Sequence, residues 1–113
     1  MKRDSGRFDD LFQFFGPISV RRMFGGEGIY AGDVMIGLVA DARLYMKATD
    51  LNRADFEAEG CGPFTFPRGE KTMTLPYYAV PERLLDDPDG FADWARKAQA
   101  AALAARTPGK KRR

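Results

Sequence analysis

The sequence predicts a two-layer α+β domain: an antiparallel sheet of about five or six strands with three helices packed on it, in the order α-β-β-β-β-α-β-β-α. Short apolar runs punctuated by Gly and Asp fill residues 18–48, and a second hairpin pattern spans residues 64–80. Helical spacing is confined to three other segments. The turns between runs are too short for parallel crossovers. At 113 residues and 44% hydrophobic composition, the chain has room for one core.

The first helix is predicted at residues 8–15. One face carries four large apolar side chains at the i, i+3, i+4, i+7 spacing: Phe8, Leu11, Phe12 and Phe15. A Gly-Pro pair at residues 16–17 ends the segment. Because burial of these side chains contributes far more than helix propensity, the helix is expected to dock on the sheet.

Four strands follow, at residues 18–24, 28–30, 34–40 and 43–48. Residues 34–40 are apolar at nearly every position, so this strand is expected at the centre of the sheet. In the fourth strand apolar residues alternate with Arg43, Tyr45 and Lys47, which indicates one buried face and one wetter face.

The second half of the chain is expected to form a helix, a hairpin and a last helix. The helix is predicted from Thr49 or Asp50 to about Glu59, and the residues expected to face inward are Leu51, Ala54 and either Phe56 or Ala58. A hairpin spans residues 64–66 and 71–80, with Pro76 at an edge or a bulge. Asp87 is the predicted N-cap of the last helix and Pro88 its first residue. Residues 4–106 are the predicted domain, and residues 107–113 a basic tail.

Composition excludes several kinds of site. The chain has no histidine, which removes the usual general base, the His-assisted nucleophiles and the commonest zinc ligand. One cysteine, Cys61, permits no internal disulfide. We therefore expect no enzyme activity, no cofactor and no metal. With no secretory signal pattern and no apolar run long enough to span a bilayer, the expected location is the cytoplasm.

Charge is distributed unevenly along the sequence. Seven of the 18 basic residues lie at the two ends, which leaves 11 cations against 16 acids and a body with a net charge of about −5. That sign is unfavourable for a folded surface that grips phosphates. Any nucleic-acid binding is therefore expected through the termini, chiefly the tail residues Arg106, Lys110, Lys111, Arg112 and Arg113.

The most distinctive stretch reads Arg-Arg-Met-Phe-Gly-Gly-Glu-Gly at residues 21–28. It lacks the Lys-Ser/Thr of a phosphate-binding loop and runs into a strand rather than a helix, so a tight or bulged hairpin is the main interpretation and a ligand or partner contact the alternative. Adjacent Tyr77 and Tyr78 should point to opposite faces, so at least one belongs to the core. The candidate interaction residues are Arg21, Arg22, Met23, Phe24, Gly25, Gly26, Tyr45, Lys47 and Tyr78.

Five segments together resemble a known family. They are the initial Phe-x-x-Leu-Phe, the Val-Arg-Arg-Met-Phe-Gly-Gly-Glu-Gly-Ile-Tyr stretch at residues 20–30, Leu-Tyr-Met-Lys at 44–47, Pro-Phe-Thr-Phe at 63–66 and Pro-Tyr-Tyr-Ala-Val-Pro at 76–81. This order is similar to that of the TfoX N-terminal domain family, named for regulators of DNA-uptake competence. The resemblance implies an antiparallel α+β fold of the secretion-chaperone kind and a link to transcriptional regulation. It supplies no catalytic residues.

The leading hypothesis is a non-catalytic regulatory module that binds a protein partner, either a component of the transcription machinery or a second copy of the chain in a homodimer. One alternative is weak nucleic-acid binding through the basic termini. The other is a small ligand held by the glycine-rich hairpin beside Arg21, Arg22, Tyr45 and Lys47.

Overall fold

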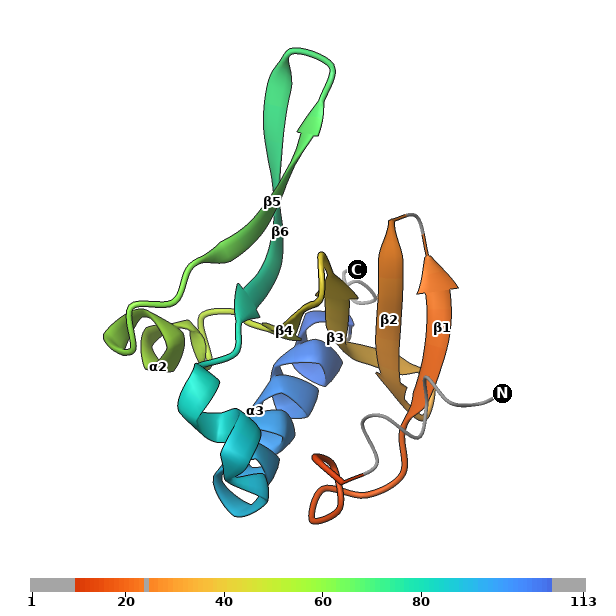
Figure 1. The fold of residues 1–113 in the computed structure, drawn as a ribbon, viewed down its shortest axis with the longest axis vertical. Coiled ribbons are helices and arrows are strands. Elements are labelled where there is room, and N and C mark those ends of the chain that lie inside the picture. The colour runs from red at the N-terminus through yellow and green to blue at the C-terminus, as the bar shows by residue number, and fades with distance from the viewer. Residues whose placement is uncertain (1–9, 24, 107–113) are drawn as a thin grey trace, which may run out of the picture.

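A computed structural model describes residues 10–23 and 25–106 of the chain (Figure 1). Within these residues the strands form one sheet in the order β1-β2-β3-β4-β6-β5, and all neighbouring pairs are antiparallel. The strands are β1 (Ser19–Met23), β2 (Gly26–Ala31), β3 (Val34–Ala40), β4 (Arg43–Lys47), β5 (Pro63–Arg68) and β6 (Lys71–Ala79). The predicted fold class is confirmed.

The helical elements are α2 (Arg53–Ala58), the 3₁₀ helix η1 (Glu82–Asp86) and α3 (Pro88–Arg106). Helix α3 lies along one face of the sheet and packs mainly on β3 and β4 (Figure 1). We call this the inner face and the opposite surface the outer face. Among the described residues, no helix combines the length and apolar character needed to cross a bilayer.

The segment predicted as the first helix forms turns over residues 10–15, and Phe8 lies outside the described residues. Its apolar spacing still identified the residues that pack inward. Phe12 is buried, and its ring meets that of Phe91 edge-on at 4.8 Å between centroids. Leu11 and Phe15 pack beside it. A single turn places residues three and four apart on the same side, as a helix does, so the pattern alone does not distinguish the two.

Helix α2 begins later than predicted, because the Asn52 side chain forms hydrogen bonds with the non-helical residues that precede the helix. The Asn52 amide donates to the carbonyl oxygen of Lys47 at 3.0 Å, and its side-chain oxygen accepts the backbone N–H of Thr49 at 2.9 Å. Of the residues predicted to face inward, only Phe56 is buried. The exposed ones are Leu51, Ala54 and Ala58.

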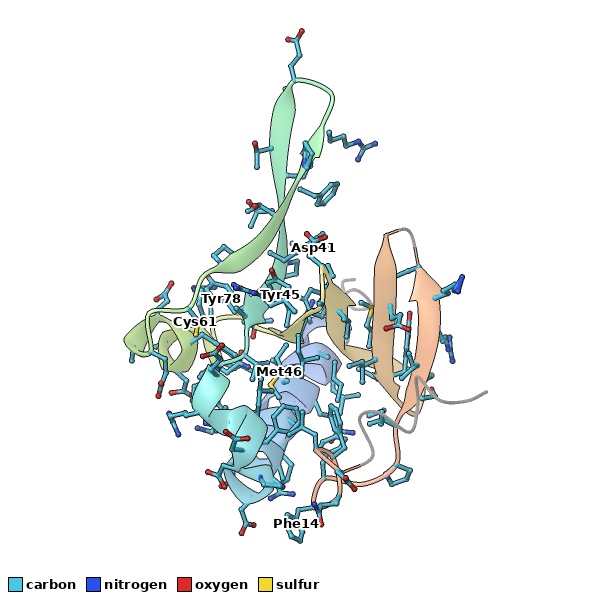
Figure 2. All side chains as sticks on the ribbon, in the orientation of Figure 1. Phe14, Asp41, Tyr45, Met46, Cys61 and Tyr78 are labelled. Atoms are coloured by element: carbon cyan, nitrogen blue, oxygen red, sulfur yellow. The ribbon has the colours of Figure 1, made fainter. Side chains whose placement is uncertain are left out.

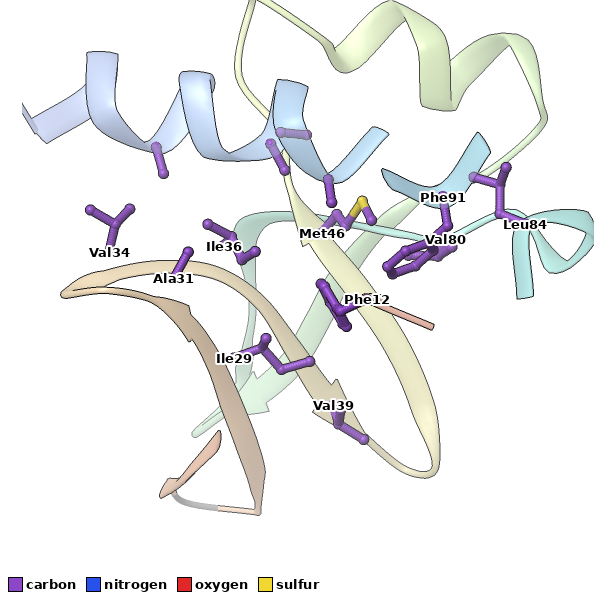
Figure 3. Packing of buried hydrophobic residues seen from close by; sticks show 14 of the residues in the cluster. Phe12, Ile29, Ala31, Val34, Ile36, Val39, Met46, Val80, Leu84 and Phe91 are labelled. Carbon is purple, nitrogen blue, oxygen red and sulfur yellow. The ribbon is translucent and has the colours of Figure 1, made fainter. Parts of the chain in front are cut away.

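The main core lies between the inner face and α3 (Figure 3). Its largest fully buried side chains are Phe56, Phe91, Ile29, Ile36 and Leu84. Helix α3 contributes mostly alanine, which allows its backbone to lie close to the sheet. The helix starts as predicted, because Asp87 Oδ1 accepts the backbone N–H of Gly90 at 3.1 Å.

A β-bulge in β3 explains its unbroken apolar run. Ile29 pairs with Gly37 and Tyr30 with Met35, so Ile36 is an extra residue on β3. The bulge shifts the alternation of side chains along the strand. Val34, Ile36 and Val39 therefore join the inner core, and Met35, Leu38 and Ala40 join a second apolar cluster on the outer face.

The outer cluster depends on the β5–β6 hairpin, which projects away from the body of the domain (Figure 1). Tyr77 is buried at the base of this hairpin, and Phe64 and Leu75 pack beside it. Tyr78 belongs to the inner core. The two tyrosines thus face opposite sides of the sheet, as the strand alternation predicts.

Candidate functional site at the glycine-rich hairpin

The glycine-rich segment forms the turn between β1 and β2, which confirms the predicted tight hairpin. Met23 pairs with Gly26, and Gly25 has φ +74°, a conformation that other residues rarely adopt. A Cβ at Gly26 would lie 2.1 Å from the carbonyl oxygen of Val39. Glycine is therefore required at residue 26 for the close approach of β2 to β3.

A hollow of about 710 Å³ lies beside this turn. Its apolar lining includes Leu11, Val39, Leu44 and Leu85, and its charged lining is Arg22, Glu27 and Asp41. We call it the hairpin hollow. Leu85 is 45% exposed, so an apolar side chain is open to solvent at its rim.

A second depression, of about 370 Å³, lies on the other side of the same turn. Its lining includes Leu38 and Ala40 from β3 and the side chains of Phe64, Phe66 and Leu75 from the projecting hairpin. We call it the outer groove. Met23, Gly25 and Gly26 line both depressions, so the predicted motif separates two concave surfaces.

The two arginines of the motif diverge. Arg21 places its guanidinium over the ring of Tyr30 on the outer face, at 4.2 Å from the centroid. Arg22, the next residue along β1, lines the hairpin hollow. Phe24 lies outside the described residues.

Tyr45 and Lys47 lie on the outer face, and Figure 2 shows Tyr45 and Met46 on opposite sides of β4. The Tyr45 ring meets Phe64 edge-on at 5.1 Å, and the Lys47 ammonium lies 5.3 Å from the centre of the Tyr77 ring. Burial lowers the pKa of Lys47 and raises the pKa of Tyr77 to about 12.

Tyr78 is separated from the other candidates. It points to the inner face and packs against Phe56 at 5.8 Å between ring centroids. The structure therefore brings Arg21, Tyr45 and Lys47 to one face of the sheet and directs Tyr78 to the other.

Sequence reasoning assigned no role to Phe64, Phe66 or Leu75. The i, i+2 spacing of the two phenylalanines was an available signal that both face the same side of a strand. These three residues lie near Leu38 because the projecting hairpin is positioned beside β3. A local sequence pattern cannot predict that position.

The remaining candidates contribute no chemistry that the structure describes. Arg106 is the last residue of α3, and the other tail cations, Lys110, Lys111, Arg112 and Arg113, lie outside the described residues. In the described ranges, no three His, Cys, Asp or Glu residues are placed to share a metal. Burial is the main cause that raises the pKa of the Cys61 thiol, which opposes thiolate chemistry.

Comparison with known proteins identifies the family of the chain. The family model of the TfoX N-terminal domain matches residues 10–102. The chain is 36% identical over 76 residues to the DNA transformation protein TfoX1 of Aliivibrio fischeri, a match that covers 67% of this chain and 36% of that protein. The chain thus spans about a third of the length of this curated relative. With nearly the whole described domain matched, the chain belongs to the TfoX N-terminal domain family.

Proposed function

We propose that this chain is a non-catalytic regulatory module in the control of DNA transformation, and that it acts by binding a protein partner at the hairpin hollow. Membership of the family and the name of the Aliivibrio fischeri relative support a role in DNA transformation. The hairpin hollow supports action through protein binding. We propose that the module acts on transcriptional regulation.

The observation that carries the proposal is the composition of the hollow. Leu11, Leu44 and Leu85 provide apolar surface, and Arg22 and Asp41 provide charge in the same lining. Protein interfaces combine apolar side chains with polar and charged ones. Because Leu85 is already 45% exposed, a partner could bury it without rearrangement of the core.

Two features support a non-catalytic role. The sequence has no histidine to serve as a general base. The glycines of the motif are explained by backbone geometry, since Gly25 takes a positive φ and Gly26 meets Val39. No phosphate cradle or reaction is needed to account for them.

The test is a chimera in which this chain replaces the matching segment of the Aliivibrio fischeri protein. We expect the chimera to restore transformation in a strain that lacks that protein, and Leu85→Asp to abolish it, because a buried carboxylate opposes docking. A photo-crosslinking residue at position 85 should also yield a defined adduct with one protein.

Leu51→Asp is the matched control, since Leu51 is 66% exposed and precedes α2. It should leave transformation unchanged. Thermal unfolding of the isolated variants checks that both fold. Full transformation by a folded Leu85→Asp chimera, or a crosslinking pattern that is the same at positions 85 and 51, would contradict the proposal.

A further inference from the structure

The outer face of the sheet has a charge that the sequence total does not reveal. By strand register, its outward positions include basic residues from four of the six strands: Arg21, Arg43, Lys47, Arg68 and Lys71. Among the strand residues that the structure describes, no outward position holds Asp or Glu.

The carboxylates of the described residues lie outside these strand positions, although Asp41 lines the outer groove and Asp33 lies in a depression with Tyr30 and Lys47. Glu27 is the acidic residue within the strands and pairs with Arg22 on the inner side. The others belong to helices or to turns, of which Asp33, Asp41 and Glu70 border the outer face. Arg43, the first residue of β4, lies near Cys61 and opposes the rise in the pKa of that thiol, so we place Arg43 at the margin of the outer face. The net negative body therefore has one cationic face.

Aromatic rings lie between these cations. Tyr30, Tyr45, Phe64 and Phe66 are all half-buried, so each exposes part of its side chain. The rings of Phe64 and Phe66 stack at 5.9 Å with an interplanar angle of 22°, and Tyr45 meets Phe64 at 5.1 Å. Tyr77 is buried beneath them. The outer groove provides an apolar recess next to these rings.

We propose that the outer face binds single-stranded nucleic acid. Bases would stack on Tyr45, Phe64 and Phe66, and Arg21 and Lys47 would contact phosphates. A sheet face with exposed aromatic rings and nearby cations is a recurrent means of binding single strands. A duplex hides its base faces within its own stack, and an acidic peptide would satisfy the cations but leave the rings uncovered.

This surface is separate from the hairpin hollow, because β1 directs Arg21 to one side and Arg22 to the other. These neighbours form a matched pair for a test. Arg21→Glu and Arg22→Glu change the net charge equally, yet only Arg21→Glu changes the proposed nucleic-acid surface. Arg22→Glu instead changes the proposed protein site, so failure of either proposal can be recognised separately.

The experiment measures fluorescence anisotropy of a labelled oligothymidine with the full-length chain. At physiological salt we expect a Kd between about 10⁻⁴ and 10⁻⁶ M. Contact with two phosphates, through Arg21 and Lys47, predicts a slope of log K against log salt of about −1.4, or about 7-fold weaker binding for a four-fold rise in salt. Arg21→Glu should weaken binding at least about 5-fold, and Arg22→Glu less than about 2-fold at physiological salt, where distant charges are screened.

Phe66→Ile separates stacking from packing, because it keeps apolar volume but has no aromatic face. It should weaken binding by between about 5-fold and 150-fold, as for the loss of one stacked base. Circular dichroism confirms the fold of each variant. Deletion of residues 107–113 should preserve the difference between Arg21→Glu and Arg22→Glu.

Several results would overturn the inference. They include no anisotropy change at about 10⁻⁴ M chain, equal affinity for duplex of the same length, equal effects of the two arginine variants, and loss of all binding on deletion of residues 107–113. Competition by a polyglutamate peptide as effective as that by unlabelled oligothymidine would also reject it and indicate an acidic protein ligand.

Discussion

A methyl group at Gly26 would lie 2.1 Å from the carbonyl oxygen of Val39, so the contact between β2 and β3 accepts only hydrogen at this position. We predict that Gly26→Ala lowers the free energy of unfolding by about 2 kcal/mol or more, because the clash is with backbone that cannot rotate away. Urea unfolding monitored by Trp94 fluorescence measures the change.

Gly62→Ala is the control for this prediction. Gly62 is exposed, and nothing would lie within 4 Å of its added Cβ. Its stability should stay within about 0.5 kcal/mol of the parent chain. If Gly26→Ala were equally well tolerated, the glycine requirement at the hairpin would be wrong.

The turn between β3 and β4 contains consecutive positive φ angles, 53° at Asp41 and 63° at Ala42. This conformation is that of a two-residue hairpin turn in which glycine is preferred at the second position. Ala42→Gly should therefore raise the free energy of unfolding by about 0.5 to 1 kcal/mol, since it removes the steric cost of the left-handed conformation.

Ala100→Gly is the control, and it should lower the free energy of unfolding in the same assay. Ala100 is exposed within α3, where glycine costs about 1 kcal/mol relative to alanine. Loss of stability in both variants would mean that the turn at residue 42 is not strained.

Asn52 joins the end of β4 to the start of α2 through its hydrogen bonds with Lys47 and Thr49. It is 3% exposed, so its replacement leaves backbone groups without a partner away from water. We expect Asn52→Ala to lower the free energy of unfolding by about 2 kcal/mol. Gln13→Ala, which removes an exposed side-chain hydrogen bond, should cost less than about 0.5 kcal/mol. Equal effects would contradict a structural role for Asn52.

The raised pKa of Tyr77 predicts that the domain loses stability at alkaline pH. Burial raises its pKa in the folded chain from 10 to about 12, so the folded state retains a proton that the unfolded state releases. The stabilising contribution is complete below pH 10 and is lost as the pH rises from 10 to about 12. Unfolding midpoints measured across this window should fall less steeply for Tyr77→Phe. An identical pH dependence in the two proteins would show that Tyr77 titrates normally.

The sequence predicted the elements whose signals are local. The run at residues 34–40 matches β3, and the Asp87-Pro88 pair marks the start of α3. It did not predict the late start of α2, because the Asn52 side chain bonds to β4 rather than within its own helix. The sequence also could not distinguish a helix from the turns observed at residues 10–15, since both place apolar residues at the same spacing.

The candidate site was predicted in part. The motif at residues 21–28 was correctly located on a hairpin, but the outer groove requires Leu38 and Phe66, which are distant in sequence, to lie together. The cationic outer face could not be predicted from net charge. A sum of charges along the chain does not say which face of the sheet each charge occupies, whereas strand register assigns each residue to one face.

The projecting hairpin also defines where the domain can change in length. Because side chains alternate with a period of two, a deletion of two residues from each of β5 and β6 near Gly69 would preserve which rings face the groove. Removal of a single residue from one strand would move the side chains beyond the deletion to the opposite face of the hairpin. The projecting hairpin can therefore be shortened or lengthened only in even steps if the layer beneath α3 is to stay the same.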